Sequence, residues 1–146
     1  ALQNRGSGFS LEPGHPNVVA PGKRPFHTII PGFLTRGGEA VGPFGVMGGH
    51  MQAQGHLQVA LHTIDGGLDP QTALGRPRWF WDAATGQVLV EDTAGADAVA
   101  ALRERGHDAV VAEHSGIFGR GQAIWRIPDG YVAGSEPRAD GVPMAW

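Results

Sequence analysis

Two adjacent glycines, Gly48 and Gly49, stand directly before a stretch with helical periodicity and are the first candidates for chemistry in this chain. Backbone N–H groups at the start of a helix lack helical carbonyl partners, and the helix dipole favours negative charge there. Such a turn can bind a phosphate or stabilise the oxyanion of an acyl-transfer intermediate. No Lys-Ser/Thr pair follows Gly49 and no GxGxxG pattern is present, which argues against phosphate. By pattern alone, a tight turn that serves only packing is the stronger interpretation.

Three histidines, His50, His56 and His62, follow at six-residue intervals and raise the question of a metal site. Six residues turn a helix by about 600°, so the three side chains would point in different directions. On a strand, neighbouring histidines would lie roughly 20 Å apart. The spacing therefore predicts no metal site. We expect His56 and His62 to face solvent or form hydrogen bonds, and His50, beside the glycines, to face a ligand.

Hydrophobic periodicity indicates the elements that position the glycines. Phe26–Arg36 is predicted as one buried strand, or two strands interrupted at Pro31, in a hairpin with a strand that ends at Gly48 and Gly49. A helix over Met51 to Ile64 follows. Its core face would carry Leu57, Ala60, Leu61, Ile64 and Leu68, and its polar face Gln54, Gln58, His62 and Asp65. Met47 and Met51, which flank the glycines, are expected to pack in the core.

The remaining elements follow from caps and turns. Asp69 and Pro70 predict a short helix through Leu74, because Asp is a good N-cap and Pro a good first residue. The runs "RWFWD" and "QVLVED" predict a hairpin, "GADAVAALRERG" a helix that ends before Gly106, and "DAVVAE" a strand. A last hairpin turns at 128–130. This order predicts a layered fold with a largely antiparallel sheet and helices on one face.

The composition sets limits on function. The chain has 146 residues, no cysteine and a net charge of −3. It can form one domain, but thiolate chemistry and a disulfide framework are excluded, and no basic surface for nucleic acid or membrane is indicated. No apolar run reaches the roughly 20 residues that span a bilayer. The opening "ALQNRGSGFS" has no initiator Met and reads as the middle of a longer sequence, so we expect a fragment or a processed subunit.

The order of several motifs resembles the gamma-glutamyltranspeptidase family over nearly the whole chain. The motifs are "LQNRGSGFSL", "PGKRPFHTIIPGFL", "VMGGHMQAQGHLQVALHTIDGGLDPQTALGRPRW" and "SEPRADG", in the order found in the later part of that family's small subunit. The resemblance implies an α+β class and the layered αββα fold of N-terminal nucleophile hydrolases. Residues 1–146 would be its C-terminal portion, with an irregular segment lining the active site at 1–25 and sheet and helices at 26–146.

The resemblance also implies a mechanism. In this family a precursor cleaves itself, and the new N-terminal Thr attacks an amide carbonyl with its own α-amino group as the base. The match assigns Gly48 and Gly49 to the oxyanion hole, which reverses the interpretation from pattern alone. The nucleophile would lie upstream of the "LQNRG" region, outside this chain, so we expect the chain to be inactive by itself.

Two departures from the family concern the substrate. Transpeptidases carry a Gln and an Asp that hold the substrate's α-amino group, at the positions of Arg5 and Gly8 here. Their paired serines, which hold the α-carboxylate, correspond to His27 and Thr28. Loss of a carboxylate and gain of a cation favour a substrate with a carboxylate and no ammonium. The alternative is that Arg5 and His27 are ordinary surface residues of a loop.

We therefore predict part of a gamma-glutamyltranspeptidase-like amide hydrolase or acyl transferase. Its partners would be the upstream large-subunit segment, the N-terminal part of the small subunit and a small amide, with a homo-oligomer open; no nucleic acid, membrane, metal or cofactor is expected. A cytoplasmic location in a bacterium is favoured, and a periplasmic or secreted one stays open. Two alternatives are a non-catalytic paralogue that acts as a binding or structural module, and a metal-binding protein built on the His/Met run, which the spacing disfavours.

Overall fold

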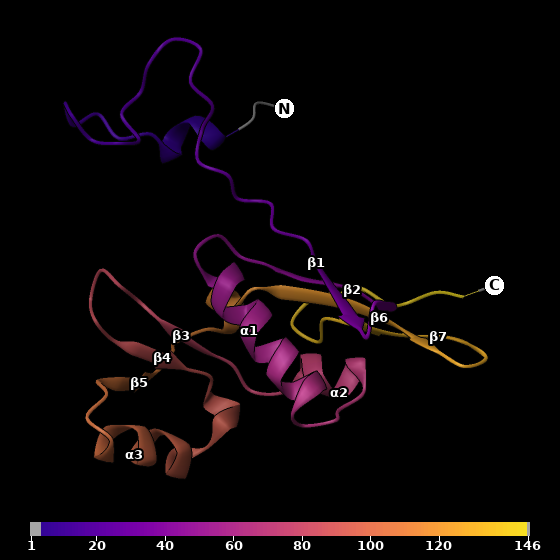
Figure 1. The fold of residues 1–146 in the computed structure, drawn as a ribbon. Helices are drawn as coiled ribbons and strands as arrows, with labels where there is room; N and C mark the ends of the chain where they lie inside the picture. Colours follow the sequence, from indigo (N-terminus) through magenta and orange to yellow (C-terminus); the bar gives the residue numbers. More distant parts are fainter. Residues whose placement is uncertain (1–3, 146) are drawn as a thin grey trace.

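A computed structural model describes residues 4–145 and contains two sheets (Figure 1). The larger sheet has four antiparallel strands in the order β1-β2-β6-β7. Their bounds are β1 Gly32–Arg36, β2 Glu39–Met47, β6 Arg120–Ile127 and β7 Gly130–Ser135. The predicted hairpins β1–β2 and β6–β7 are confirmed.

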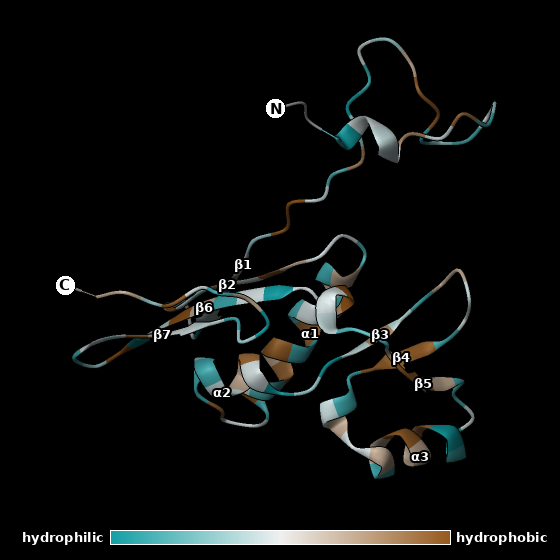
Figure 2. Cartoon of the chain, turned by 180° about the vertical axis from the view of Figure 1, so that it is seen from behind, coloured by the Kyte–Doolittle hydropathy of each residue, from teal (hydrophilic) through white to brown (hydrophobic). Residues whose placement is uncertain are grey.

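The first half of the predicted strand at Phe26–Arg36 is wrong. Residues 26–31 are irregular, and Phe26 and Ile29 are exposed. Pro31 explains the boundary, since proline has no N–H to donate to a ladder and is tolerated at the start of a strand but not within one. The chain therefore enters the sheet only at Gly32, and residues 4–31, here called the N-terminal segment, stand off from the sheets (Figure 2).

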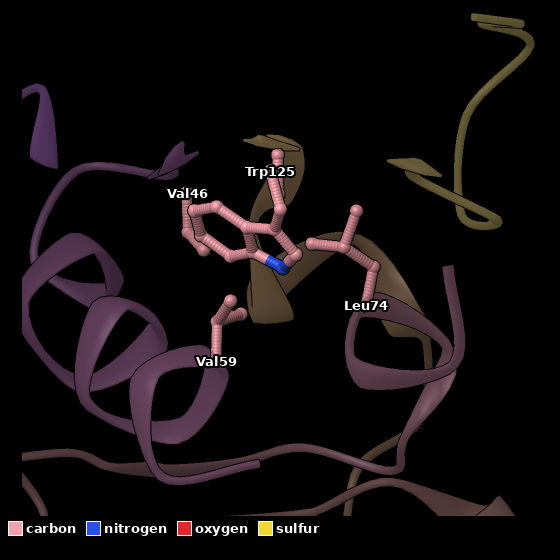
Figure 3. Packing of buried hydrophobic residues seen from close by; sticks show 5 residues of the cluster. Val46, Val59, Leu74 and Trp125 are labelled. Carbon is pink, nitrogen blue, oxygen red and sulfur yellow. The ribbon is translucent and has the colours of Figure 1, made fainter. Parts of the chain in front are cut away.

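Two helices cover one face of the larger sheet. Helix α1, Met51–Ile64, has the predicted bounds, and helix α2, Pro70–Gly75, begins at the predicted cap, where the Asp69 carboxylate accepts the Thr72 N–H at 3.0 Å. The hydrogen bonds from Thr72 lower the pKa of Asp69. Side chains from both helices and the sheet meet in the core; Figure 3 shows Val46, Val59, Leu74 and Trp125 packed together.

The second sheet contains β3 Trp79–Trp81, β4 Val88–Val90 and β5 Ala109–Val111. The predicted hairpin is confirmed by the antiparallel pair β3–β4, but β4 and β5 are parallel. Helix α3, Ala96–Glu104, makes the crossover between them and ends before Gly106, whose φ is +89°. Most of the strand pairs are antiparallel as predicted, but the strands form two sheets rather than one. The pair β4–β5 is parallel because a helical crossover returns the chain in the same direction.

The predicted faces of α1 are also wrong. Gln58 is only 4% exposed, whereas Leu57, at 50%, and Leu61 and Ile64 are exposed. The reason lies in the edge of β3. The Gln58 side chain accepts from the Trp79 N–H and donates to the Trp79 carbonyl, and Gln54 does the same for Trp81. The two glutamines thus bond an edge strand that would otherwise present unpaired peptide groups.

The flanking methionines differ from each other. Met51 is buried in the core as predicted, but Met47 is exposed, which corrects that expectation. Met47 is the last residue of β2, and the alternation along this strand directs Val46 rather than Met47 toward the helices. Within the described residues, none of the helices has the length and hydropathy needed to cross a membrane.

Candidate functional site

The glycine turn, Gly48 and Gly49, joins the end of β2 to the start of α1. Both residues have positive φ, +149° and +62°. A Cβ on Gly48 would lie 2.9 Å from Gly119 Cα, whereas a Cβ on Gly49 would meet no atom within 4 Å. The Met51 and Gln52 N–H groups donate to the carbonyls of Gly48 and Gly49. The turn is thus packed tightly on the Gly48 side and open on the Gly49 side.

A cleft of about 440 Å³ opens beside the glycine turn. Its walls include Arg5, Gly8, His27 and Thr28 from the N-terminal segment and Gly49 and His50 from the turn. A second hollow of about 630 Å³ shares several of these residues and adds Gly48. The seven residues predicted for the site therefore surround one region. Their individual roles stay predictions.

Two hydrogen bonds meet at Thr28, one within the N-terminal segment and one from helix α1. The Arg5 guanidinium donates to the Thr28 hydroxyl at 2.7 Å, and the Gln52 side-chain amide donates to the Thr28 carbonyl at 2.6 Å. Arg5, Thr28 and Gln52 are all half-buried. Gln52 is a residue that sequence reasoning missed; its partner lies 24 residues away, so no local pattern indicates the contact.

The other two histidines of the run point elsewhere. His56 Nδ1 lies 2.6 Å from the Gln52 carbonyl, and its ring is tilted against Phe44, so the predicted hydrogen-bonding role is confirmed. The pKa of His62 is lowered, first by burial and then by the positive charges of Arg76 and Arg78. Among residues 4–145, no group of three or more His, Asp or Glu side chains is arranged to hold a metal ion.

Behind the glycine turn lies a buried charge network of Arg78, Glu91, Glu136 and Arg138. Arg78 donates to Glu136 at 2.8 Å, with side chains 2% and 0% exposed. Arg138 donates to both Glu91 and Glu136. Since Glu91 follows β4 and Glu136 follows β7, the network ties the two sheets together.

The hydrogen bonds of the network fix the protonation state of one acid. Burial alone would raise the pKa of Glu91, but hydrogen bonds from the Arg138 side chain and the Arg78 N–H lower it below its ordinary value. Glu91 is therefore charged near neutral pH. In the sequence, "GRPRW" and "SEPRADG" served only as family motifs. The charged residues in these motifs, which lie next to strand ends, were the signal that could have indicated the network.

The charge network reaches the glycine turn through Gly119. The Arg78 guanidinium donates to the carbonyls of Phe118 and Gly119 at 3.0 and 3.3 Å. Gly119 packs against Gly48, and a Cβ on Gly119 would collide with the Met47 carbonyl. The connection between β5 and β6, which contains Gly119, thus supports the glycine turn.

Comparison with known proteins places this arrangement in a family. The sequence profile of gamma-glutamyltranspeptidase matches residues 1–146. The chain is 37% identical over 150 residues to the oxamate amidohydrolase proenzyme of Klebsiella pneumoniae and 35% identical over 149 residues to the glutathione hydrolase-like YwrD proenzyme of Bacillus subtilis. These matches cover 99% and 98% of this chain and 28% of each relative. The chain therefore spans little more than a quarter of these relatives.

Solved structures show the same fold. The cephalosporin acylase of Bacillus halodurans is 57% identical with a TM-score of 0.92, over 100% of this chain and 27% of that one. The gamma-glutamyltranspeptidase of Pseudomonas nitroreducens is 24% identical with a TM-score of 0.84, over 99% of this chain and 81% of that one, a likeness of fold alone. The predicted α+β class and N-terminal nucleophile hydrolase fold are confirmed.

Proposed function

This chain belongs to the gamma-glutamyltranspeptidase family, and on that premise we propose that it is the C-terminal portion of an amide hydrolase or acyl transferase. It would supply the oxyanion hole from the glycine turn and the acyl-group contacts from the N-terminal segment. The observation that carries the proposal is the shared cleft, since Arg5, His27 and Thr28 line it together with Gly49, more than 20 residues further along the chain.

The proposed mechanism needs a nucleophile from outside this chain. An N-terminal Thr attacks the amide carbonyl carbon while its α-amino group takes the hydroxyl proton. The carbonyl oxygen becomes an oxyanion and accepts hydrogen bonds from N–H groups of the glycine turn. The C–N bond then breaks, the amine leaves with the proton, and water hydrolyses the acyl-enzyme or an amine accepts the acyl group.

We propose that the acyl group carries a carboxylate and no ammonium. A guanidinium at Arg5, held toward the cleft by Thr28, suits a carboxylate, and Gly8 offers no charge for an ammonium. One relative, the oxamate amidohydrolase above, is named for a substrate other than a gamma-glutamyl compound. Oxamate itself is an amide with a carboxylate and no ammonium.

The proposed partners are the remaining parts of the same enzyme. Leu57, Leu61 and Ile64 form an exposed apolar stripe on α1. On β6, Ile124 is also exposed, on the sheet face opposite to the buried Ala123 and Trp125. Contiguous apolar surface of this kind is typical of a face covered by another segment. We therefore propose that upstream segments cover both faces, and that the chain is inactive without them.

A matched pair of substrates tests the proposal. Glutaryl-p-nitroanilide and gamma-glutamyl-p-nitroanilide differ only by the α-ammonium. In the full-length protein, kcat/KM should be at least about tenfold higher for the glutaryl compound, because the ammonium of the gamma-glutamyl compound would be placed near the Arg5 cation. Arg5→Ala should raise KM for the glutaryl compound by about tenfold or more, because a hydrogen bond to a charged group contributes about 1.5–3 kcal/mol. A preference for the gamma-glutamyl compound would contradict the assignment of the acyl group.

Two controls separate the parts of the proposal. Acetyl-p-nitroanilide carries no carboxylate, so Arg5→Ala should leave its KM unchanged. The isolated 146-residue chain should turn over none of the three anilides. Turnover by the isolated chain would contradict the external nucleophile, and no turnover by the full-length protein would favour a non-catalytic paralogue.

A further inference from the structure

We propose that Gln52 is a positioning residue for acyl-group recognition: its side-chain amide holds the Thr28 peptide and, through Thr28, the Arg5 guanidinium. The inference rests on the proposed function and deepens it. Gln52 donates to the Thr28 carbonyl at 2.6 Å, and the hydroxyl of the same Thr28 accepts from Arg5 at 2.7 Å. One residue of α1 therefore anchors the backbone that presents the acyl-group contacts.

The anchor matters because the N-terminal segment has little structure of its own near Thr28. Residues 23–31 form no helix or strand, and most of them are exposed. A segment of this kind takes its position from tertiary contacts, and the contact from Gln52 comes from the first turn of a helix. An anchored peptide fixes its side chain more closely than a free loop does, which is what a specific contact to a charged group requires.

Gln52 also touches the other half of the site. Its backbone N–H donates to the Gly49 carbonyl at 3.2 Å, so Gln52 is bonded directly to the glycine turn. Backbone and side chain of one residue thus connect the proposed oxyanion donors to the proposed carboxylate contact.

The neighbouring Gln54 provides a matched control. It lies on the same helix and also uses its side-chain amide, but its partners are the N–H and carbonyl of Trp81 in the second sheet. Replacement of either glutamine by Met removes an amide from α1 and keeps the length of the side chain. Only the Gln52 change removes a bond to the segment that carries Arg5.

The experiment compares KM and kcat in the full-length protein. Gln52→Met should raise KM for glutaryl-p-nitroanilide by about three- to tenfold, the loss of one intramolecular hydrogen bond, with kcat within about twofold. KM for acetyl-p-nitroanilide should not change, and Gln54→Met should change neither KM. In an Arg5→Ala background the effect of Gln52→Met should disappear, because Gln52 acts through Arg5.

Each outcome decides the inference. Additive effects of Gln52→Met and Arg5→Ala would mean that Gln52 contacts the substrate directly and would overturn the positioning role. An equal rise in KM for both anilides would also overturn it. Gln52→Asn is the second variant: it keeps the amide but cannot span the same distance, so it should behave like Gln52→Met. Failure of both variants to fold would overturn the inference and make Gln52 a structural residue. If the wild type shows no preference for the glutaryl over the acetyl compound, the proposed acyl-group assignment fails. If it shows the preference and Gln52→Met changes neither KM, this inference fails alone.

Discussion

The two walls of the cleft are built in opposite ways. The glycine turn lies between a central strand and a helix, and behind it Gly119 and the charge network are buried. The N-terminal segment, by contrast, has one 3₁₀ turn, Arg5–Gly8, and an isolated bridge between Ser10 and Val18. The first wall is held by burial and the second by individual hydrogen bonds.

This difference matches the two tasks proposed for the walls. Oxyanion stabilisation requires donors that do not reorganise during the reaction, which favours a wall built into the core. Acyl-group choice can change by substitution in a loop while the scaffold stays the same. The departures that the family resemblance indicates, at Arg5, Gly8, His27 and Thr28, would all lie in the N-terminal segment, and the glycine turn would keep the family pattern.

The largest effect should come from breaking the charge network. Arg78→Met removes one of the cations that pair with the buried Glu136 and takes the guanidinium donor from the Phe118 and Gly119 carbonyls, which should lower the free energy of unfolding by about 3–5 kcal/mol. Arg126→Met, which removes an exposed pair with Glu39 at 3.6 Å, is the control and should cost about 0–1 kcal/mol. Urea denaturation of the purified protein measures both. Similar losses would show that the wall behind the glycine turn is not held by the network.

The next effect should separate the two glycines. Gly48→Ala combines an unfavourable φ with a Cβ 2.9 Å from Gly119 Cα, and we expect a loss of about 2–4 kcal/mol. Gly49→Ala meets no neighbouring atom, so only the backbone conformation costs free energy, about 1–2 kcal/mol. Thermal or urea unfolding of the two variants gives the comparison. A larger loss for Gly49→Ala would mean that the turn is not packed as described.

Local signals in the sequence predicted much of this fold. The bounds of α1, the Asp69 cap and three hairpins depend on residues close together in the chain, and all are confirmed. The faces of α1 were wrong because Gln54 and Gln58 bond the edge of β3, a partner that periodicity does not contain. The parallel pair β4–β5 was missed because pairing across a crossover leaves no short-range signal.

For the candidate site, too, the sequence indicated some residues and missed those that act through distant partners. The family resemblance indicated six of the seven lining residues, and the position beside the glycines indicated His50. The structure brings the seven together around two adjoining hollows. Gln52, Gly119 and Arg78 were missed because each acts through a partner at least 24 residues away. Polar side chains that bond distant backbone carry no periodic pattern, so only the tertiary structure shows them.

A smaller effect should appear in the pH dependence of stability. The folded pKa of His62 is below its ordinary value of 6.5, so the unfolded chain binds more protons than the folded one between these two values. The contribution to stability is complete above about pH 6.5 and is lost as the pH falls through the folded pKa. Acidification from pH 7.5 to 5.5 should therefore destabilise the protein, and His62→Gln should reduce this slope.

The charge network can be tested through the same histidine. Arg78 is one of the charges that lower the pKa of His62. In Arg78→Met the His62 pKa, measured from the imidazole proton shifts by NMR, should rise toward its ordinary value. An unchanged pKa in a folded Arg78→Met variant would mean that burial and Arg76 account for the shift, and that the charge network does not influence His62.

The smallest effect on stability should come from the N-terminal segment. Asn17 donates from its side-chain amide to the Gly8 carbonyl at 2.6 Å at an exposed position. Asn17→Ala should change the free energy of unfolding by no more than about 0.5 kcal/mol. Its consequence should be local: the N–H groups of Ser10 and Val19, which donate to the carbonyls of Asn17 and Ser10, should exchange with solvent faster.

Hydrogen exchange of the Val46 and Val59 amides serves as the internal reference, because both residues are buried in the core behind the glycine turn. If the two walls are held independently, Asn17→Ala accelerates exchange at Ser10 and Val19 and leaves the core amides unchanged. Exchange that rises equally in both places would mean that the N-terminal segment unfolds only together with the sheets. Substitutions in the N-terminal segment that suit a new acyl group would then also lower the stability of the wall that contains the glycine turn.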